Sequence, residues 1–264
     1  MKKQNILLVD AGNSSVKWSM TDTPDTNELS QMQQKFYPEN ISISFFTQCW
    51  GDLEKPERVV VSCVADKKVL YALNKACDQL WGIKVKEINS LKEASGFVNA
   101  YIEPSDLGSD RWCAMIGANE KISSDFIVVD CGSAITIDLV TSHEKNVSRH
   151  LGGYILPGLE MMKRSLGTQT ADVKVDLEHT KITLSPSNTT IGCVNSAVYL
   201  SAIKLIETVF EQQVKQNGGV QCLLTGGDAP LLAEFLSFDY TIMPDLVLRG
   251  LSVIDTARLE NKNN

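Results

Sequence analysis

The chain has 264 residues, a formal net charge of −7, a pI of about 5.1 and a hydrophobic content of 43%. This length is enough for one or two domains with a sizeable core. The acidic balance argues against nucleic acid as a partner, since binding a phosphate backbone needs a basic surface.

The first half of the chain alternates strand and helix patterns. Apolar positions at helical spacing predict a helix over Asp66–Leu80 and a second helix at about Arg111–Glu120. Strands are expected at Ile6–Val9, Val16–Met20, Val59–Val64 and Lys84–Ile88.

The opening pattern then returns in the second half. The stretch DFIVVDCGSAITIDLV, Asp125–Val140, is again an apolar strand, an Asp-x-Gly-Ser turn and an alternating strand. Helices are expected at about Leu159–Leu166 and Thr190–Gln213, and VQCLLTGGDAPLLAEFL predicts a buried strand, a glycine turn and a helix. The stretch DLVLRGLSVIDTARL predicts a C-terminal helix. We therefore expect an α/β protein of two similar halves, residues 1–120 and 121–264, joined near Asn119–Asp125 and facing each other across a cleft.

The cysteines and the N-terminus bear on cellular location. The seven cysteines are scattered and none forms a C-x-x-C pair, so we interpret them as reduced thiols of a cytosolic protein. The N-terminal residues reach Asp10 too soon for a signal peptide, and no apolar run is expected to span a membrane. Three histidines lack zinc spacing and are expected at solvated positions, namely His143, His150 and His179.

The two Asp-x-Gly turns have a shared chemistry. Glycine lets a ligand approach the backbone, and N–H groups and hydroxyls in a turn suit phosphate oxygens. Because an aspartate and a phosphate repel each other, the carboxylate would need a cation such as Mg²⁺ between them. A single such turn is more often an ordinary hairpin, but two copies, one in each half, favour a nucleotide site. The turn TGGDA, Thr225–Ala229, is either a tight connection or an adenosine-binding loop, and no P-loop or dinucleotide-binding fingerprint is present.

The chain resembles the type III pantothenate kinase family of the acetate kinase/sugar kinase/Hsp70/actin superfamily. The matching stretches follow the family order over nearly the whole chain: DAGNSSVK, NAYIEPSDLGSDRW, DCGSAIT, GGYILPGLEMM, NTTIG, LLTGGDA and PDLVLRGL. The resemblance implies two duplicated ribonuclease H-like halves with a nucleotide cleft between them. It also implies ATP-dependent phosphorylation of pantothenate to 4′-phosphopantothenate, the first step of coenzyme A biosynthesis, in a cytoplasmic homodimer.

The resemblance further implies roles for particular residues. Asp110 would be the proton acceptor beside Arg111, Asp130 would bind a monovalent cation, K⁺ or NH₄⁺, and Asp10 would hold Mg²⁺, directly or through water. The expected ATP and phosphate contacts are Asp10, Ala11, Gly12, Asn13, Ser14, Ser15, Val16, Lys17, Gly132, Ser133, Gly226 and Gly227. The expected pantothenate contacts are Tyr101, Gly108, Ser109, Asp110, Arg111 and Thr189. Ser14 and Ser133 stand where the family usually has threonine, which keeps the hydroxyl and loses a methyl contact.

Each of these residues also has a purely structural interpretation. Ser109 could cap a helix whose dipole Asp110 favours, and Tyr101 could be a half-buried loop aromatic. Either Thr189 or Thr190 could cap the following helix, and the spacing of the segment favours Thr189 for the substrate role.

The sequence leaves two alternative functions and the oligomeric state undecided. The chain could be a non-catalytic, nucleotide-binding transcription-accessory protein of the same fold, or a kinase for another small alcohol. The stretch GGYILPGLEMMKRSL carries apolar side chains that fit a dimer interface or a core helix, namely Leu156, Leu159, Met161, Met162 and Leu166.

Overall fold

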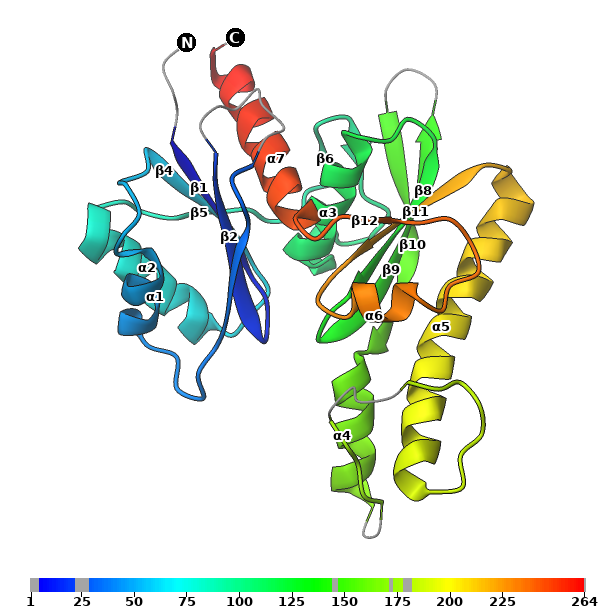
Figure 1. The fold of residues 1–264 in the computed structure, drawn as a ribbon. Helices are drawn as coiled ribbons and strands as arrows, with labels where there is room; N and C mark the ends of the chain where they lie inside the picture. The colour runs from blue at the N-terminus through cyan, green and yellow to red at the C-terminus, as the bar shows by residue number, and fades with distance from the viewer. Residues whose placement is uncertain (1–4, 22–28, 144–146, 171–172, 178–181, 264) are drawn as a thin grey trace. The chain divides into compact units, whose positions relative to one another are not determined.

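The computed structural model describes residues 5–21, 29–143, 147–170, 173–177 and 182–263. The chain divides into two compact units (Figure 1). Unit 1 comprises residues 1–121, 143–149 and 245–264, and unit 2 comprises residues 122–142 and 150–244.

Unit 1 is built on a five-stranded sheet of order β3-β2-β1-β4-β5. Strand β1 forms an antiparallel hairpin with β2 and pairs in parallel with β4. All six residues of β1 are buried, as expected for a central strand covered on both faces. The strands are β1 (Ile6–Ala11), β2 (Ser15–Thr21), β3 (Gln33–Phe36), β4 (Arg58–Cys63) and β5 (Lys86–Glu87).

Helices α1 (Ile43–Trp50) and α2 (Lys67–Trp81) lie on the same face of this sheet (Figure 1). The side chain of Asp66 caps α2 by accepting a hydrogen bond from the N–H of Lys68 at 2.8 Å. The buried apolar side chains of α1 and α2 pack against alternate residues of β1 and β4 and form the main core of unit 1.

Helices α3 (Ser109–Asn119) and α7 (Leu246–Asn263) pack closely against each other in unit 1. A Cβ atom at Gly117 would lie 2.8 Å from the backbone nitrogen of Gly250, and a Cβ at Gly250 would overlap the carbonyl oxygen of Cys113. The paired glycines therefore allow the two backbones to approach. Between β5 and α3 the chain forms β6 (Glu93–Ala94), β7 (Phe97–Val98) and a 3₁₀ turn at Pro104–Asp106, and β7 pairs with the start of β10.

Unit 2 repeats the strand arrangement of unit 1. Its strands have the order β12-β11-β8-β9-β10, with an antiparallel β8–β9 hairpin and parallel pairing of β8 with β11 and of β11 with β12. The strands are β8 (Asp125–Cys131), β9 (Ala134–His143), β10 (Val147–Pro157), β11 (Val220–Thr225) and β12 (Thr241–Ile242). The matching order supports the duplication that the two Asp-x-Gly turns predict.

Helices α4 (Leu159–Gln169), α5 (Thr190–Asn217) and α6 (Ala229–Ala233) complete unit 2. Apolar side chains of α5 and α6, with Leu159 of α4, pack on β8, β9 and β11. Helix α5 is long and apolar enough to cross a membrane, with a mean hydropathy of 1.3 over 18 of its residues. The expectation that no run could span a membrane is therefore wrong as far as length and composition go. Half of that stretch is buried inside the protein, as in an ordinary core helix.

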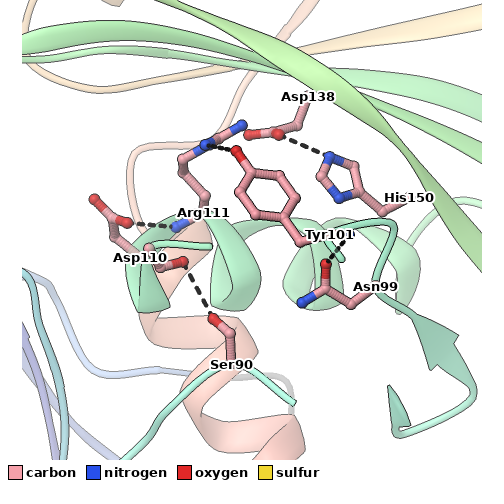
Figure 2. Close-up of polar contacts among 8 residues, drawn as sticks. Ser90, Asn99, Tyr101, Asp110, Arg111, Asp138 and His150 are labelled. Atoms are coloured by element: carbon pink, nitrogen blue, oxygen red, sulfur yellow. Dashed lines mark hydrogen bonds and ion pairs between the residues drawn. The ribbon is translucent and has the colours of Figure 1, made fainter. Parts of the chain in front are cut away.

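The structure also differs from the sequence-based expectations at His150 and Leu156, and it contains several short elements that were not expected. His150, expected at a solvated position, is only 3% exposed, and its Nε2 lies 3.0 Å from Oδ1 of Asp138 on β9 (Figure 2). Leu156, assigned to a helical stripe, belongs to β10. The side chains of His143 and His179 lie outside the described residues. The short elements α1, β3, β6, β7 and β12 had no clear periodicity in the sequence.

Candidate active site

The first Asp-x-Gly turn joins β1 to β2 at the end of a buried strand. The N–H of Gly12 donates to the carbonyl of Ser15 at 3.1 Å, which closes the turn. Asn13 and Ser14 are exposed, whereas the side chains of Ala11 and Val16 are buried and can offer only backbone atoms to a ligand. The accessible side of the turn therefore presents backbone N–H groups and hydroxyl groups, which suit phosphate oxygens.

Other members of this loop already have partners. The hydroxyl oxygen of Ser15 accepts a hydrogen bond from Gln34 Nε2 of β3 at 3.0 Å. Lys17 of β2 lies directly opposite Asp10 in the hairpin register. Ser15 thus has its own hydroxyl proton left to donate, and Lys17 is held beside the aspartate by strand pairing.

Asp10 and Asp110 are linked through two serines of unit 1. Asp10 pairs with Ser62 in the β1–β4 register, and Ser62 Oγ lies 2.9 Å from Ser109 Oγ. Ser109 is the first residue of α3, and Asp110 follows it. The fold therefore brings the end of β1 to the start of α3, although 100 positions separate the two aspartates in the sequence.

The thiol of Cys113 is influenced by both aspartates. Burial on α3 is the main reason that the pKa of Cys113 lies well above its usual value, and the charges of Asp10 and Asp110 raise it further. Burial likewise raises the pKa of Tyr37, and the charges of Cys63 and Asp10 add to this effect. The two carboxylates thus contribute negative charge to the same part of unit 1, where a bound cation would be stabilised.

Arg111 is a buried cation beside the second aspartate. Its side chain is only 7% exposed, and its Nη1 donates to the hydroxyl of Tyr101 at 2.8 Å (Figure 2). The guanidinium carbon lies 5.7 Å from the centre of the Tyr101 ring, close enough for a cation–π contact. The N–H of Arg111 also donates to Asp110 Oδ1 at 2.7 Å. The structure therefore brings Tyr101 and Arg111 together, and their expected contact with the substrate stays a prediction.

Buried polar residues fix the loop that carries Tyr101. Asn99 Oδ1 accepts from the N–H of Tyr101 at 2.9 Å (Figure 2). Its Nδ2 donates to the carbonyls of Leu91 and Pro104, each at 3.2 Å. Ser90 Oγ donates to the carbonyls of Leu107, at 2.8 Å, and Gly108, at 3.4 Å.

The sequence interpretation assigned no role to Asn99, Ser90 or Ser62. The only signal for Ser62 was a serine inside the apolar run VVVSCV. Ser90 gave no signal, and Asn99 gave only its place at the start of the family-like stretch NAYIEPSDLGSDRW, because the contacts of both depend on the tertiary fold.

The start of α3 differs from the expected cap. Gly108 is the N-cap residue, and no side chain makes a capping hydrogen bond there. The prediction that Ser109 caps the helix is therefore wrong, because its hydroxyl contacts Ser62 of β4 instead. Asp110 does lie in the first turn, where a negative charge is favourable to the helix dipole.

The second Asp-x-Gly turn lies in unit 2 against the glycine turn that follows β11. The N–H of Asp228 donates to the carbonyl of Cys131 at 2.9 Å. Gly226 has φ +91°, and a Cβ atom there would lie 2.5 Å from Asp130 Oδ1. A side chain at Gly226 would therefore clash with the aspartate, so the glycine allows both loops to meet.

The remaining loop residues are accessible. Ser133 and Gly227 are exposed, and Gly132 is half-buried. Burial holds the pKa of Cys131 well above its usual value, and the charges of Asp130 and Asp228 raise it further. Unit 2 thus brings together the predicted residues Asp130, Gly132, Ser133, Gly226 and Gly227.

Thr189 lies at the start of α5 and is its N-cap. Its Oγ1 accepts from the N–H of Gly192 at 3.2 Å, and Thr190 is the first helical residue. Among the described residues, the side-chain contacts of Thr189 stay within its own segment, with Ser187 and Gly192. The contacts therefore explain its capping role and do not join it to the loops around Asp130.

Known structures share this fold. A Campylobacter jejuni protein, named as a candidate Baf family transcriptional activator, superposes with a TM-score of 0.59 and 24% identity over 98% of this chain and 100% of its own. MreB 5 of Spiroplasma citri, solved with AMPPNP, superposes with a TM-score of 0.50 and 9% identity over 99% and 98% of the two chains. These similarities show an actin-like ATPase fold.

Comparison of the sequence with known proteins identifies the family as well as the fold. A protein of Nitrosococcus oceani named type III pantothenate kinase is 32% identical, with coverage of 98% of this chain and 97% of its own. A Marinobacter nauticus protein of the same name is 34% identical, with coverage of 96% and 98%. The family model described as type III pantothenate kinase matches residues 6–212. The chain belongs to the type III pantothenate kinase family.

Proposed function

We propose that this protein transfers the γ-phosphoryl group of ATP to the terminal hydroxyl of pantothenate, which gives 4′-phosphopantothenate in the first step of coenzyme A synthesis. Family membership supports the reaction. The observation that carries it at the level of the site is the chain of contacts that joins Asp10, through Ser62 and Ser109, to Asp110. The proposed phosphate-binding turn after Asp10 and the candidate base Asp110 therefore lie close to each other in unit 1.

Asp110 is the proposed proton acceptor. Its carboxylate would orient the substrate hydroxyl and take its proton as the oxygen attacks, a role that requires hydrogen-bond reach in the complex. Arg111 would bind and orient pantothenate, because a guanidinium offers a fixed fork of donors to a carboxylate or another anionic oxygen. Tyr101 holds that guanidinium, and Gly108, Ser109 and Thr189 complete the proposed substrate contacts.

The two Asp-x-Gly turns are the proposed phosphate-binding elements. In the first turn, Asn13 and Ser14 would donate backbone and hydroxyl hydrogens to phosphate oxygens, while Gly12, whose N–H donates to the carbonyl of Ser15, would let the phosphate approach the backbone. In the second, Ser133 would donate in the same way beside Gly132, whose N–H donates to the carbonyl of Ala134, with Gly226 and Gly227 beside the nucleotide. Phosphoryl transfer depends mainly on positioning and charge neutralisation, and these groups supply both.

Cations are needed because both turns carry a carboxylate. Mg²⁺ bound with ATP usually takes one or two protein carboxylates and several phosphate and water oxygens, and Asp10 is the proposed contact. No cluster of three or more His, Cys, Asp or Glu residues that could hold a metal occurs in the described residues. Asp130 is the proposed contact for K⁺ or NH₄⁺, and the cations would neutralise charge that develops on the phosphates.

A homodimer in the cytoplasm is part of the proposal. Strand β10 and helices α4 and α5 of unit 2 expose large apolar side chains that a partner could bury. These are Leu151, Tyr154, Ile155, Met161, Leu166, Ile191 and Leu200. A second copy of the chain would cover them. A monomeric mass at micromolar concentration in light scattering would contradict the dimer.

An ADP-release assay with a panel of alcohols tests the choice of substrate. Pantothenate should stimulate ADP release in the presence of Mg²⁺ and K⁺, whereas glycerol and glucose should leave it at the background rate. Turnover with glucose and none with pantothenate would assign the protein to another branch of the superfamily.

A further inference from the structure

The edge strand β3 and the residue after it contact both serines of the first Asp-x-Gly turn. Gln34 of β3 donates from its side-chain Nε2 to Ser15 Oγ at 3.0 Å. Tyr37, the residue after β3, donates from its backbone N–H to the carbonyl of Ser14 at 3.0 Å. One short segment, to which the sequence interpretation assigned no role, therefore holds the two hydroxyl-bearing residues of the proposed phosphate-binding turn.

Strand β3 has a fixed position although all four of its residues are exposed. Its backbone pairs antiparallel with β2, and this register places Gln34 opposite Lys17. Just after the strand, the Tyr37 ring packs edge-on against Phe45 and Phe46 of α1, with ring centres 5.8 and 6.4 Å apart. Strand pairing and these aromatic contacts therefore fix the point from which Gln34 donates.

Gln34 also shares one face of the sheet with Asp10. Residues that lie opposite each other in paired strands point to the same side of a sheet. The registers of β3, β2 and β1 place Lys17 between Gln34 and Asp10. The register of β1 with β4 places Ser62, which contacts the start of α3, on the other side of Asp10. Gln34 is therefore the outer end of a row of polar side chains that crosses the sheet beside the turn.

The hydrogen bond from Gln34 restricts the direction of the Ser15 hydroxyl. A hydroxyl has one proton to donate and two lone pairs that accept. Because the Gln34 amide occupies one lone pair, the Ser15 proton has to point to a different acceptor. Hydrogen bonds in a chain polarise one another, so a Ser15 hydroxyl that accepts from an amide is a better donor to an anionic oxygen. A phosphate oxygen at the turn is an acceptor that fits this arrangement.

We propose that Gln34 is a positioning residue for ATP binding, which holds the Ser15 hydroxyl so that its proton points to a phosphate oxygen of the nucleotide. This inference rests on the proposed kinase activity, in which Ser15 is an expected phosphate contact. The affinity for ATP then depends on a strand outside the Asp-x-Gly motif. The pantothenate contacts proposed for Tyr101 and Arg111 do not depend on it.

Gln34→Glu reverses the direction of the hydrogen bond. A carboxylate only accepts, so the Ser15 hydroxyl donates to it and turns a lone pair toward the phosphate. KM for ATP rises about tenfold, because a hydrogen bond to a charged group is lost. KM for pantothenate stays unchanged.

Gln33→Glu is the matched control, because it adds the same charge one residue away on the other face of β3. The register places Gln33, which is exposed, opposite Trp18, whose side chain belongs to the core under α1 and α2. This variant leaves both KM values unchanged. An equal rise in KM for ATP in the two variants contradicts the proposal, since it would be a general effect of negative charge.

A double-mutant cycle shows whether Gln34 acts through Ser15. Gln34→Met removes the hydrogen bond without adding charge and raises KM for ATP about fivefold, the order expected for one hydrogen bond. In a protein that already carries Ser15→Ala, Gln34→Met causes no further rise, because the hydroxyl that it positions is absent. Effects that multiply independently overturn the proposal.

Calorimetric titration with Mg²⁺ and a non-hydrolysable ATP analogue separates this inference from the proposed function. Weaker binding by Gln34→Met at an unchanged melting temperature supports the role of Gln34 even if the wild type fails to phosphorylate pantothenate. That failure would count against the proposed function alone. Wild-type affinity in Gln34→Met overturns the inference, as does a lower melting temperature with kcat and both KM values changed alike.

Discussion

At the scale of single residues, the candidate site combines charged groups that motifs reveal with neutral groups that they do not. Asp110 and Arg111 could be predicted from the sequence because they belong to a stretch that resembles a known family. Ser62 could not, because a serine in an apolar strand gains its role only from what the fold places beside it. Asn99 lies in the same stretch as Asp110, but its part in holding the loop of Tyr101 follows only from the contacts that the fold gives it.

Asp110→Asn tests the proposed base. The amide keeps the size of the side chain but cannot accept the proton, so kcat should fall by about 10²–10⁴-fold, the usual contribution of general base catalysis. The melting temperature should stay close to that of the wild type. Turnover equal to the wild type would remove Asp110 from this role.

Arg111→Lys tests the buried guanidinium. Lysine keeps the charge but loses the planar fork and the paired geometry with Tyr101, so kcat/KM for pantothenate should fall about 100-fold. Arg164→Lys is the control, since Arg164 forms an exposed ion pair with Glu160. The two variants should be compared by initial rates, and equal rates for them would count against substrate binding by Arg111.

At the scale of elements, long periodic segments were predicted well and tertiary contacts were not. The helix expected over Asp66–Leu80 is observed as Lys67–Trp81, with Asp66 as its cap. The close packing of α3 on α7 was not foreseeable, because Gly117 and Gly250 in the sequence give no sign that they face each other. Short elements such as β3 and α1 lacked the length that makes a pattern distinct.

Gly250→Ala tests the packing of these two helices. The added methyl group would overlap the backbone of Cys113, so the free energy of unfolding should fall by about 1–3 kcal/mol. Gly219→Ala places its methyl group in open space and should change stability little. Urea unfolding of both variants measures the difference, and equal midpoints would show that α3 and α7 can separate at no cost.

Glu207 predicts a dependence of stability on pH. Burial raises the pKa of this carboxyl, but hydrogen bonds and the charge from Lys204, with hydrogen bonds from Ser237, outweigh burial, so the net pKa is lowered from 4.5. A carboxyl whose pKa is lower in the folded state stabilises the protein at pH values above its unfolded-state pKa of 4.5. This stabilisation is lost as the pH falls below that pKa and through the folded-state pKa.

Glu207→Gln should therefore cost about 1–3 kcal/mol of unfolding free energy at pH 7, the cost of a lost hydrogen-bonding group in the interior. The difference from the wild type should shrink at pH 4. Urea unfolding at both pH values measures it, and a constant difference would rule out titration of Glu207 as the cause.

At the scale of the whole molecule, duplication was the most reliable prediction. The two Asp-x-Gly turns predicted two similar halves, and the strand orders β3-β2-β1-β4-β5 and β10-β9-β8-β11-β12 match. The boundary at residues 120 and 121 stays a prediction. The C-terminal helix α7 lies in unit 1 with the N-terminal strands, an arrangement set by packing against α3.

The most direct test of the central claim is to identify the products by mass spectrometry. With ATP, Mg²⁺, K⁺ and pantothenate, the protein should form 4′-phosphopantothenate and ADP in equal amounts, and Asp110→Asn should form neither above background. ADP formation that does not depend on pantothenate, or the absence of 4′-phosphopantothenate with the folded wild-type protein, would contradict the account.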